Sequence, residues 1–494
     1  MSHLRESQTI SGNQEHNFGA YTKRFNVSMD WIILRLDFEE SWGPLLLWDP
    51  NGELRVQYLH YRNFKTVVLH RDPLYSSYLT VPGPLPLGEW KFEILGSVKN
   101  FSIQWECGSG SLPDDVVVHN GQAGFWSATG HEDEDGAIVL SGYDWNSQRN
   151  QAKKWYKGDF HTHTILSDGK LTPEEGMRQA EKMGLDFFVA TDHNLIPTVW
   201  PEGYPLVIPG MEITSSKGHF NALGLKKWVD WRQSGEDGGM ESEEGMNRVL
   251  EDTAKAGALR SINHPMLAPW DWLFKETKLA NIDTMEIWND PTFPGNPQAT
   301  EKALILWNAL WNEGYRIPGI GGSDSHNLPT ESYEDNGPPS LIGEPATYVL
   351  SDGLSAGEIL KAVKRGNVYV TRGPVLDIAI TVGKRNFVVG DDLTSAVNAA
   401  EDGMVHCLLV VSNQTSGSIR WIENGIEVLA QPIGIEDKYE CVFDWNNAEY
   451  VWRRIEIRGN EGELLAFTNP VYCGEKKPGI TTWDQLIDKV SGLL

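Results

Sequence analysis

Five short segments in the middle of the chain constrain its fold more than any other feature, because each ends in the same few types of side chain. The first contains His161 and His163, and Asp168 follows in a turn with Gly169. Alternate residues of an extended strand point to the same side, so the two histidines can reach one ion. Neutral imidazole is the commonest side-chain metal ligand, and a carboxylate adds an oxygen ligand. On its own, such a pair is equally typical of ordinary surface histidines.

The other four segments are apolar runs that end in further groups of this kind. Their ends carry, in chain order, His193, then Glu212 with His219, then His264, and then Asp324 with His326. Six of the 13 histidines of the chain therefore lie in these segments. The repetition favours one shared site over a chance pair of surface histidines.

The residues between these segments are typical of helices. Thr172 and Glu175 are suited to a capping box at the start of one helix, and Gly184 is suited to its end. Residues 243–256 and 298–313 repeat the pattern, and each run stops at a glycine. Strands that alternate with helices predict a parallel sheet, and α/β barrels place their chemistry at the carboxyl ends of such strands. We therefore expect one rim to collect nine side chains: His161, His163, Asp168, His193, Glu212, His219, His264, Asp324 and His326.

These segments resemble the motifs of a known family. The stretches GDFHTHTILSDG, TDHN, GHFNALGL, NHP and GSDSH are similar to those of the PHP (polymerase and histidinol phosphatase) superfamily of metallohydrolases. The sequences of these motifs are most similar to those of its carbaryl-hydrolase-like branch, CehA/McbA. The motifs cover about residues 155–327. The resemblance implies an α/β fold, a distorted seven-stranded (β/α)7 barrel, with two or three divalent metal ions. Zinc, manganese and iron are all compatible with nitrogen and carboxylate ligands.

The resemblance also implies which side chain binds which ion. His161, His163 and Asp324 would bind the first metal, Glu212 would bridge it to the second, His219 and His264 would complete the second, and Asp168, His193 and His326 would bind a third. Many phosphatases of the superfamily have a histidine at the position of Asp168. A hydroxide bridging the two metals would attack the substrate. Whichever of Asp168, His193 and His326 is free of metal would protonate the leaving group, so these three and Glu212 are the candidate catalytic residues.

Three more carboxylates lie close to these ligands in the sequence. Asp159 and Asp192 directly precede metal-site positions, where each would either shape a turn or tune a ligand. Glu286 ends another strand on the expected rim, and we interpret it as a strand cap.

The residues that would bind the substrate are less clearly indicated. A phosphate ester favours a cation beside the metals, and Lys217 and Arg372 are the main candidates, with Lys170 and Arg365 as others. Each is also compatible with a solvated surface charge. Six tryptophans near the same segments would suit an apolar leaving group or would pack in the core: Trp200, Trp228, Trp231, Trp270, Trp272 and Trp288.

The length of 494 residues suggests two or three domains. Short apolar or alternating runs separated by turns predict a β-sandwich at each end, within residues 27–106 and 375–475. We expect an N-terminal β-rich domain at 1–150, the metal-binding barrel at 151–374 and a C-terminal β-rich domain at 375–494.

Composition limits the possible partners and location. The net charge of −26, with no basic run, disfavours binding to nucleic acid and to anionic membranes. The chain has no apolar run of transmembrane length and no secretory signal, and its four cysteines are scattered. These features predict a cytoplasmic protein.

Together, the motifs predict a metal-dependent hydrolase that acts on a small molecule. A phosphoesterase is favoured, because that activity dominates the superfamily. Hydrolysis of a carbamate, ester or amide at the same metal site is the alternative that the branch resemblance favours. A further alternative is a catalytically inactive module that binds glycan or protein. The complete ligand set disfavours it, because unused ligands would bury charge without compensation.

Overall fold

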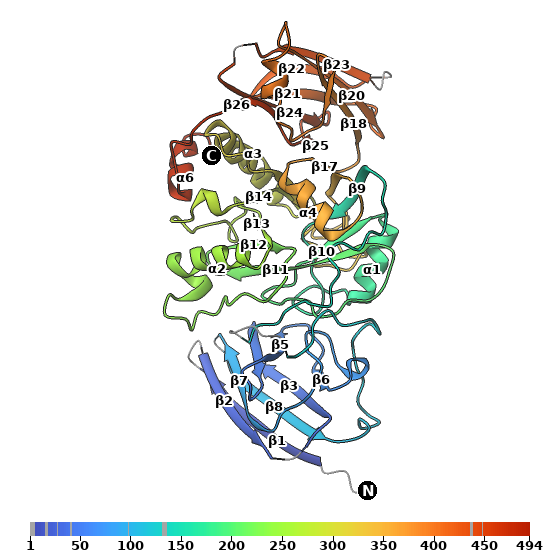
Figure 1. The fold of residues 1–494 in the computed structure, drawn as a ribbon, viewed down its shortest axis with the longest axis vertical. Helices are drawn as coiled ribbons and strands as arrows, with labels where there is room; N and C mark the ends of the chain where they lie inside the picture. Colours follow the sequence, from blue (N-terminus) through green and yellow to red (C-terminus); the bar gives the residue numbers. More distant parts are fainter. Residues whose placement is uncertain are drawn as a thin grey trace.

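The computed structural model describes residues 5–14, 18–26, 28–39, 42–96, 98–130, 136–434, 438–446 and 448–494. Three parts follow one another along the long axis of the molecule (Figure 1). Antiparallel sheets lie at both ends, and the part between them holds four of the helices and the strands that end in the predicted metal ligands. No helix among the described residues is both long and apolar enough to cross a membrane.

The N-terminal part consists of two four-stranded antiparallel sheets that face each other across a shared core. One sheet has the order β1 (Arg5–Gln14), β8 (Val98–Gly108), β3 (Trp31–Glu39) and β6 (Thr66–His70). The other has the order β2 (Phe18–Phe25), β7 (Gly88–Leu95), β4 (Gly43–Trp48) and β5 (Leu54–His60). Alternation along β3 places Ile32 and Leu34 on the inner face, against Trp90 and Phe92 of β7.

The middle part is built on seven strands that pair in sequence order. They are β9 (Lys154–Asp159), β10 (Phe187–Ala190), β11 (Leu206–Ser215), β12 (Gly218–Leu223), β13 (Leu259–Ile262), β14 (Thr284–Asn289) and β15 (Gly319–Gly322). All neighbouring pairs are parallel except those of β12, which runs antiparallel to both β11 and β13. Only Ser216 and Lys217 connect β11 to β12, and a two-residue connection makes a hairpin but not the crossover that parallel strands need.

The closed (β/α)7 barrel that we expected is not shown by this pairing. On its other side β9 pairs with β16 (Ala346–Ser351), which continues through β17 (Val368–Thr371) into the C-terminal part. The sheet does curl, because Asp324 N donates to His161 O at 2.8 Å and so joins the residues after β15 to those after β9. This curl brings the carboxyl ends of the first and last strands together.

Four helices connect the strands of the middle part: α1 (Pro173–Lys182), α2 (Glu243–Lys255), α3 (Asn296–Asn312) and α4 (Ala356–Lys364). The capping box expected at α1 is present, since Thr172 Oγ1 accepts from Glu175 N and Glu175 Oε2 accepts from Thr172 N. Gly184 has a φ of +66°, a left-handed conformation that glycine adopts without strain and that commonly ends a helix. The structure starts α3 at Asn296, slightly before the predicted residue 298.

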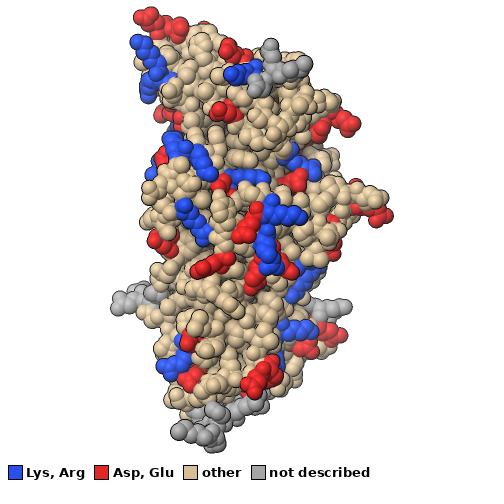
Figure 2. All heavy atoms as spheres, turned by 90° about the vertical axis from the view of Figure 1, so that its right-hand side faces the viewer, with Lys and Arg blue, Asp and Glu red and all other residues tan. Residues whose placement is uncertain are grey.

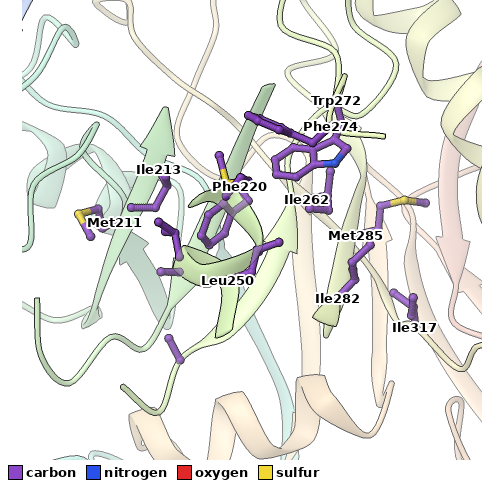
Figure 3. Close-up of a cluster of buried hydrophobic side chains, with 14 of the residues drawn as sticks. Met211, Ile213, Phe220, Leu250, Ile262, Trp272, Phe274, Ile282, Met285 and Ile317 are labelled. Atoms are coloured by element: carbon purple, nitrogen blue, oxygen red, sulfur yellow. The ribbon is translucent and has the colours of Figure 1, made fainter. Parts of the chain in front are cut away.

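The core of the middle part lies between its strands and α2 (Figure 3). Ile213 of β11, Phe220 of β12 and Ile262 of β13 are fully buried, as is Leu250 of α2. Burying a side chain of this size contributes about 1.5–3 kcal/mol relative to leaving it exposed. This packing fixes the strands whose ends carry Glu212, His219 and His264.

The C-terminal part is a second pair of sheets around its own core. One sheet has the order β19 (Arg385–Phe387), β18 (Val375–Val382), β20 (Met404–Ser412) and β23 (Lys438–Asp444). The facing strands extend the central sheet: β25 (Leu464–Thr468), β24 (Tyr450–Arg458), β21 (Ser418–Glu423) and β22 (Ile426–Pro432), with β26 (Val471–Gly474) also on β24. The short helix α5 (Thr394–Val397) lies before β20, and α6 (Trp483–Val490) returns to pack near α3.

The surface in Figure 2 carries both signs of charge. Lysine and arginine side chains are interspersed with aspartate and glutamate over this face, most densely across the middle part, and they form no large basic patch there. Among the charged side chains of the protein, ion pairs join Lys154 to Asp186 and Arg372 to Glu344.

Candidate metal centre

The structure brings all nine predicted ligand side chains to one place at the carboxyl ends of the central strands. They form three groups, within each of which one ligand atom per residue lies within 4.8 Å of the others. The groups are His161, His163 and Asp324; Glu212, His219 and His264; and Asp168, His193, His326 and again His163. The grouping follows the assignment that the family resemblance implied, except that His163 also faces the third group.

Glu212 lies at the centre of the site, and its two oxygens face different histidines. Its Oε1 is 3.3 Å from His161 Nε2 and 3.1 Å from His219 Nδ1. Its Oε2 is 3.4 Å from His163 Nε2 and 2.8 Å from His193 Nδ1. A carboxylate divided in this way between two sets of imidazoles has the arrangement needed to bridge two ions.

Two aspartates complete the outer groups. Asp324 Oδ1 is 3.2 Å from His161 Nε2 and 3.1 Å from His163 Nε2, which places one oxygen between two imidazoles. Asp168 Oδ1 is 3.3 Å from His193 Nε2 and 3.2 Å from His326 Nε2. Both groups therefore combine nitrogen and oxygen donors, as first-row transition metals prefer.

Many of these donor atoms are buried and, although ring nitrogens lie close to some of them, none has a partner with the geometry of a hydrogen bond. They are His161 Nε2, both ring nitrogens of His163, Asp168 Oδ1, Glu212 Oε2 and His264 Nδ1. Leaving a buried polar atom unsatisfied costs about 1–3 kcal/mol, and more for a charged group. Coordination to cations would satisfy these atoms, so the residues present fit a set of divalent ions.

The surroundings of the site shift the pKa values of its histidines in different directions. Burial opposes protonation of His161, but the surrounding carboxylates, Asp324 foremost, raise its pKa well above the ordinary value. Burial also works against ionisation of Glu212, but the histidines around it hold its pKa well below the ordinary value. For His163, burial and then the charge of His326 lower the pKa to about 3, so this imidazole is neutral and ready to coordinate metal.

Asp159 and Asp192 shape the turns that present the ligands. One carboxylate oxygen of Asp159 accepts from the backbone N–H groups of His161 and Ser323, both at 3.0 Å. Asp192 accepts from Thr164 N at 2.9 Å and from the hydroxyls of Thr164 and Ser167. These bonds favour the turn-forming interpretation, because each aspartate ties together backbone from two strand ends.

Glu286 has a closer relation to the site than the strand cap that we expected. Its Oε1 accepts from His161 Nδ1 at 3.0 Å, and its Oε2 accepts from His264 N at 2.9 Å. The first bond turns His161 so that Nε2 faces Asp324 and Glu212. Its position near the end of β14, level with the other ligands, was the sequence signal for such a role.

A cavity of about 750 Å³ opens above the ligands. Its floor includes Asp168, His193, Glu212, His219, His264 and Asp324. Its walls include Trp231, Met240, Trp270, Phe293, Tyr333 and, from the N-terminal sheets, Trp42. Two of the six tryptophans suggested by the sequence, Trp231 and Trp270, therefore line the cavity, whereas Trp42 was not foreseen.

The basic residues suggested as phosphate ligands lie elsewhere. Lys217 and Arg372 are not among the residues that line the cavity, and neither is Lys170. The amino group of Lys217 lies 5.6 Å from the centre of the Phe274 ring, and Arg372 Nε donates to Glu344 Oε1 at 2.7 Å. Neither residue therefore lies beside the ligands.

Comparisons with known proteins add little to this picture. No protein-family model matches the chain, and no curated protein matches it. A two-domain protein from Bacteroides vulgatus containing a predicted PHP-like metal-dependent phosphoesterase is 17% identical with a TM-score of 0.34, over 66% of this chain and 99% of that one. A proposed metal-dependent phosphoesterase from Bifidobacterium adolescentis is 16% identical with a TM-score of 0.25, over 42% and 94% of the two chains.

Proposed function

We propose that the protein is a metal-dependent hydrolase of the PHP type that cleaves phosphate esters of small molecules. One observation carries the proposal: three groups of ligand side chains meet around Glu212 at the floor of a cavity, with buried donor atoms that lack partners. A binding module that held no ions would leave this cluster of buried charge uncompensated.

Different residues of the site would bind the ions and transfer protons. His161, His163 and Asp324 would hold one ion, and Glu212 would connect it to a second held by His219 and His264. Zn²⁺, Mn²⁺ and Fe²⁺ all suit this donor set. When bound, such ions lower the pKa of a coordinated water and polarise the bond under attack.

His326 is the best placed proton donor for the leaving group. Its side chain is 26% exposed and lines the cavity, whereas those of His161 and His163 are fully buried. Its Nδ1 donates to the backbone oxygen of Asp324 at 2.7 Å, so Nε2 is the nitrogen left to face Asp168 and the cavity. A group in this position can reach the leaving atom of a bound ester.

Hydrolysis of a carbamate, carboxylic ester or amide at the same ions is the second candidate. The observation that favours it is the absence of lysine and arginine among the described residues that line the cavity. A phosphate group usually meets such a cation beside the metals, whereas an uncharged carbonyl does not need one.

The test begins with the metal content of protein purified without chelator, for which we expect at least two transition-metal ions per chain. The metal-loaded protein is then assayed on phosphate monoesters, phosphate diesters and aryl carbamates that share a p-nitrophenol leaving group. Glu212→Gln should lose one or more ions and lower kcat by at least about 100-fold, because its carboxylate faces histidines of more than one ligand group.

Glu241→Gln is the matched control. Glu241 also lines the cavity but binds Ser216 and belongs to none of the three ligand groups, so this variant should keep its metal and its rate. Hydrolysis that persists unchanged in Glu212→Gln, or in protein fully stripped of metal, would refute the proposed function. Hydrolysis of carbamates alone would select the second candidate.

The fold of the middle part, the location of the protein and its partner are also part of the proposal. A distorted seven-stranded barrel for the middle part is what the motif resemblance implies, and a cytoplasmic location is favoured by the few scattered cysteines. We expect the physiological partner to be a small molecule rather than nucleic acid or membrane, given the net charge of −26.

A further inference from the structure

The N-terminal sheets contribute part of the cavity wall. Trp42, directly before β4, and Pro44, within it, line the cavity together with Leu95, the last residue of β7, and Gly96, which follows it. These residues are far in sequence from the metal ligands, yet they face them across the same space. The side-chain amide of Gln57 fixes this arrangement, since it exchanges two hydrogen bonds of 3.1 Å with the backbone of Ile196.

Trp42 is in direct contact with the candidate metal centre. Its ring lies 4.9 Å from the ring of His193, edge to face, and 6.0 Å from the ring of Tyr61. The indole is nevertheless 38% exposed, so a large part of its surface is available to a molecule in the cavity. A tryptophan held between two rings, with an open side in a pocket, is suited to ligand contact.

A second part of the cavity wall is also aromatic. The Trp270 ring lies 5.9 Å from that of Phe293, which in turn lies 5.2 Å from that of Tyr333. Trp270 is 41% exposed and Tyr333 is 38% exposed. Large exposed aromatic side chains gathered in a concave site are typical of surfaces that bind an apolar group.

The charges of the cavity point to the same kind of ligand. Asp168, Glu212, Glu241, Asp290 and Asp324 line it, whereas no lysine or arginine does so among the described residues. The ions would neutralise the carboxylates around Glu212, but nothing beyond them would hold a second anionic group. We therefore expect the part of a substrate that extends away from the ions to carry no negative charge.

We propose that Trp42 is a specificity-determining residue, which selects esters bearing an aromatic group that packs against the aromatic side chains of the cavity wall while the ester lies on the ions. The proposal rests on the proposed hydrolase function and adds to it the class of substrate. It also assigns the N-terminal sheets a role in the site, because they supply one of the two aromatic parts of the cavity wall.

The experiment compares phenyl p-nitrophenyl phosphate with methyl p-nitrophenyl phosphate. The two diesters have the same charge and leaving group and differ only in the group that stays on phosphorus. We expect kcat/KM to be about 10- to 100-fold higher for the phenyl ester, because the phenyl ring buries apolar surface against the walls. Trp42→Ala should reduce this ratio by about tenfold, mainly through KM, and Trp42→Phe should restore most of it.

Tyr204→Ala is the control, because Tyr204 is 68% exposed and does not line the cavity. Metal content is measured in every variant, so that loss of ions through the contact with His193 is separated from loss of selectivity. An unchanged phenyl-to-methyl ratio in Trp42→Ala would overturn the inference, and so would equal rates for the two esters in the wild-type protein.

A binding measurement separates this inference from the proposed function. If the metal-loaded protein hydrolyses neither diester, calorimetric titration with phenylphosphonate and methylphosphonate decides the matter. Tighter binding of phenylphosphonate that is lost in Trp42→Ala would support the aromatic site although the proposed reaction had failed. Equal binding of both phosphonates, or equal binding by wild type and variant, would refute it.

Discussion

At the scale of single residues, Glu286 is the residue whose contact with the metal ligands was least expected. It accepts hydrogen bonds from His161 Nδ1 and from the backbone N–H of His264. Removing its charge should weaken both the orientation and the basicity of His161. We predict that Glu286→Gln keeps the fold but lowers metal affinity by about 10- to 100-fold, the usual effect of losing such a supporting bond. Competition with a chelator of known affinity measures the change.

Glu251→Gln provides the comparison for this prediction. Glu251 lies on α2 and pairs with Lys278 on the surface, so its loss should leave metal affinity as it is in the wild-type protein. Wild-type affinity in Glu286→Gln would mean that Glu286 is only the strand cap that its sequence suggested.

At the scale of elements, α1 shows how local sequence holds a segment near the site. Its capping box starts at Thr172, four residues after Asp168. We predict that Thr172→Ala destabilises the helix by about 1 kcal/mol, because a backbone N–H loses its acceptor. The amides of α1 should then exchange with solvent about five times faster, measured by hydrogen–deuterium exchange.

Thr172→Ser retains a hydroxyl that can accept the same hydrogen bond, so its exchange should match the wild-type protein. Equal exchange in Thr172→Ala and Thr172→Ser would show that tertiary packing, rather than the cap, holds this end of the helix.

At the scale of the whole molecule, a buried ion pair joins the N-terminal sheets to the middle part. Arg232 Nη1 donates to Glu93 Oε2 at 2.6 Å, and Trp48 Nε1 donates to the same oxygen at 3.0 Å. The Glu93 side chain is 2% exposed, and that of Arg232 is 20% exposed. We predict that Glu93→Gln lowers the free energy of unfolding by about 2 kcal/mol at neutral pH, as hydrogen bonds to charged groups do.

The pH dependence of that loss follows from the pKa of Glu93. Burial alone would raise this pKa, but Lys91 and Arg232 outweigh burial and lower it below the ordinary value of 4.5. Because the folded pKa is lowered, the contribution is complete above pH 4.5 and is lost as the pH falls through the folded pKa. The difference between wild type and Glu93→Gln, measured by denaturant unfolding, should therefore shrink on acidification.

An exposed pair in the same sheets gives the reference for this measurement. Asp37 and Lys65 are 78% and 72% exposed, so Asp37→Asn should change stability by less than about 0.5 kcal/mol. A constant difference between wild type and Glu93→Gln down to strongly acidic pH would contradict a stabilising charge on Glu93.

The sequence by itself determined the features that depend on a few neighbouring residues. The start of α1 followed from Thr172 and Glu175, because capping is completed within one turn. Strands such as β3, β6 and β7 in the N-terminal part and β18, β20 and β24 in the C-terminal part followed from apolar or alternating runs, whereas β1 and β2 precede the predicted segment. The meeting of His161 with Asp324 also followed, because both come at the carboxyl ends of strands in one sheet.

Only the tertiary structure decided the contacts between distant segments. The antiparallel direction of β12 and the continuation of the central sheet into the C-terminal part depend on the hairpin between β11 and β12 and on the pairing of β16 with β9. The contact of Trp42 with His193 depends on how the N-terminal sheets pack on the middle part. The absence of Lys217 and Arg372 from the described cavity wall was equally beyond the sequence. Periodicity and capping depend on residues that are close together in the chain. The contacts named above depend instead on how the surfaces of distant segments pack, which no local sequence pattern specifies.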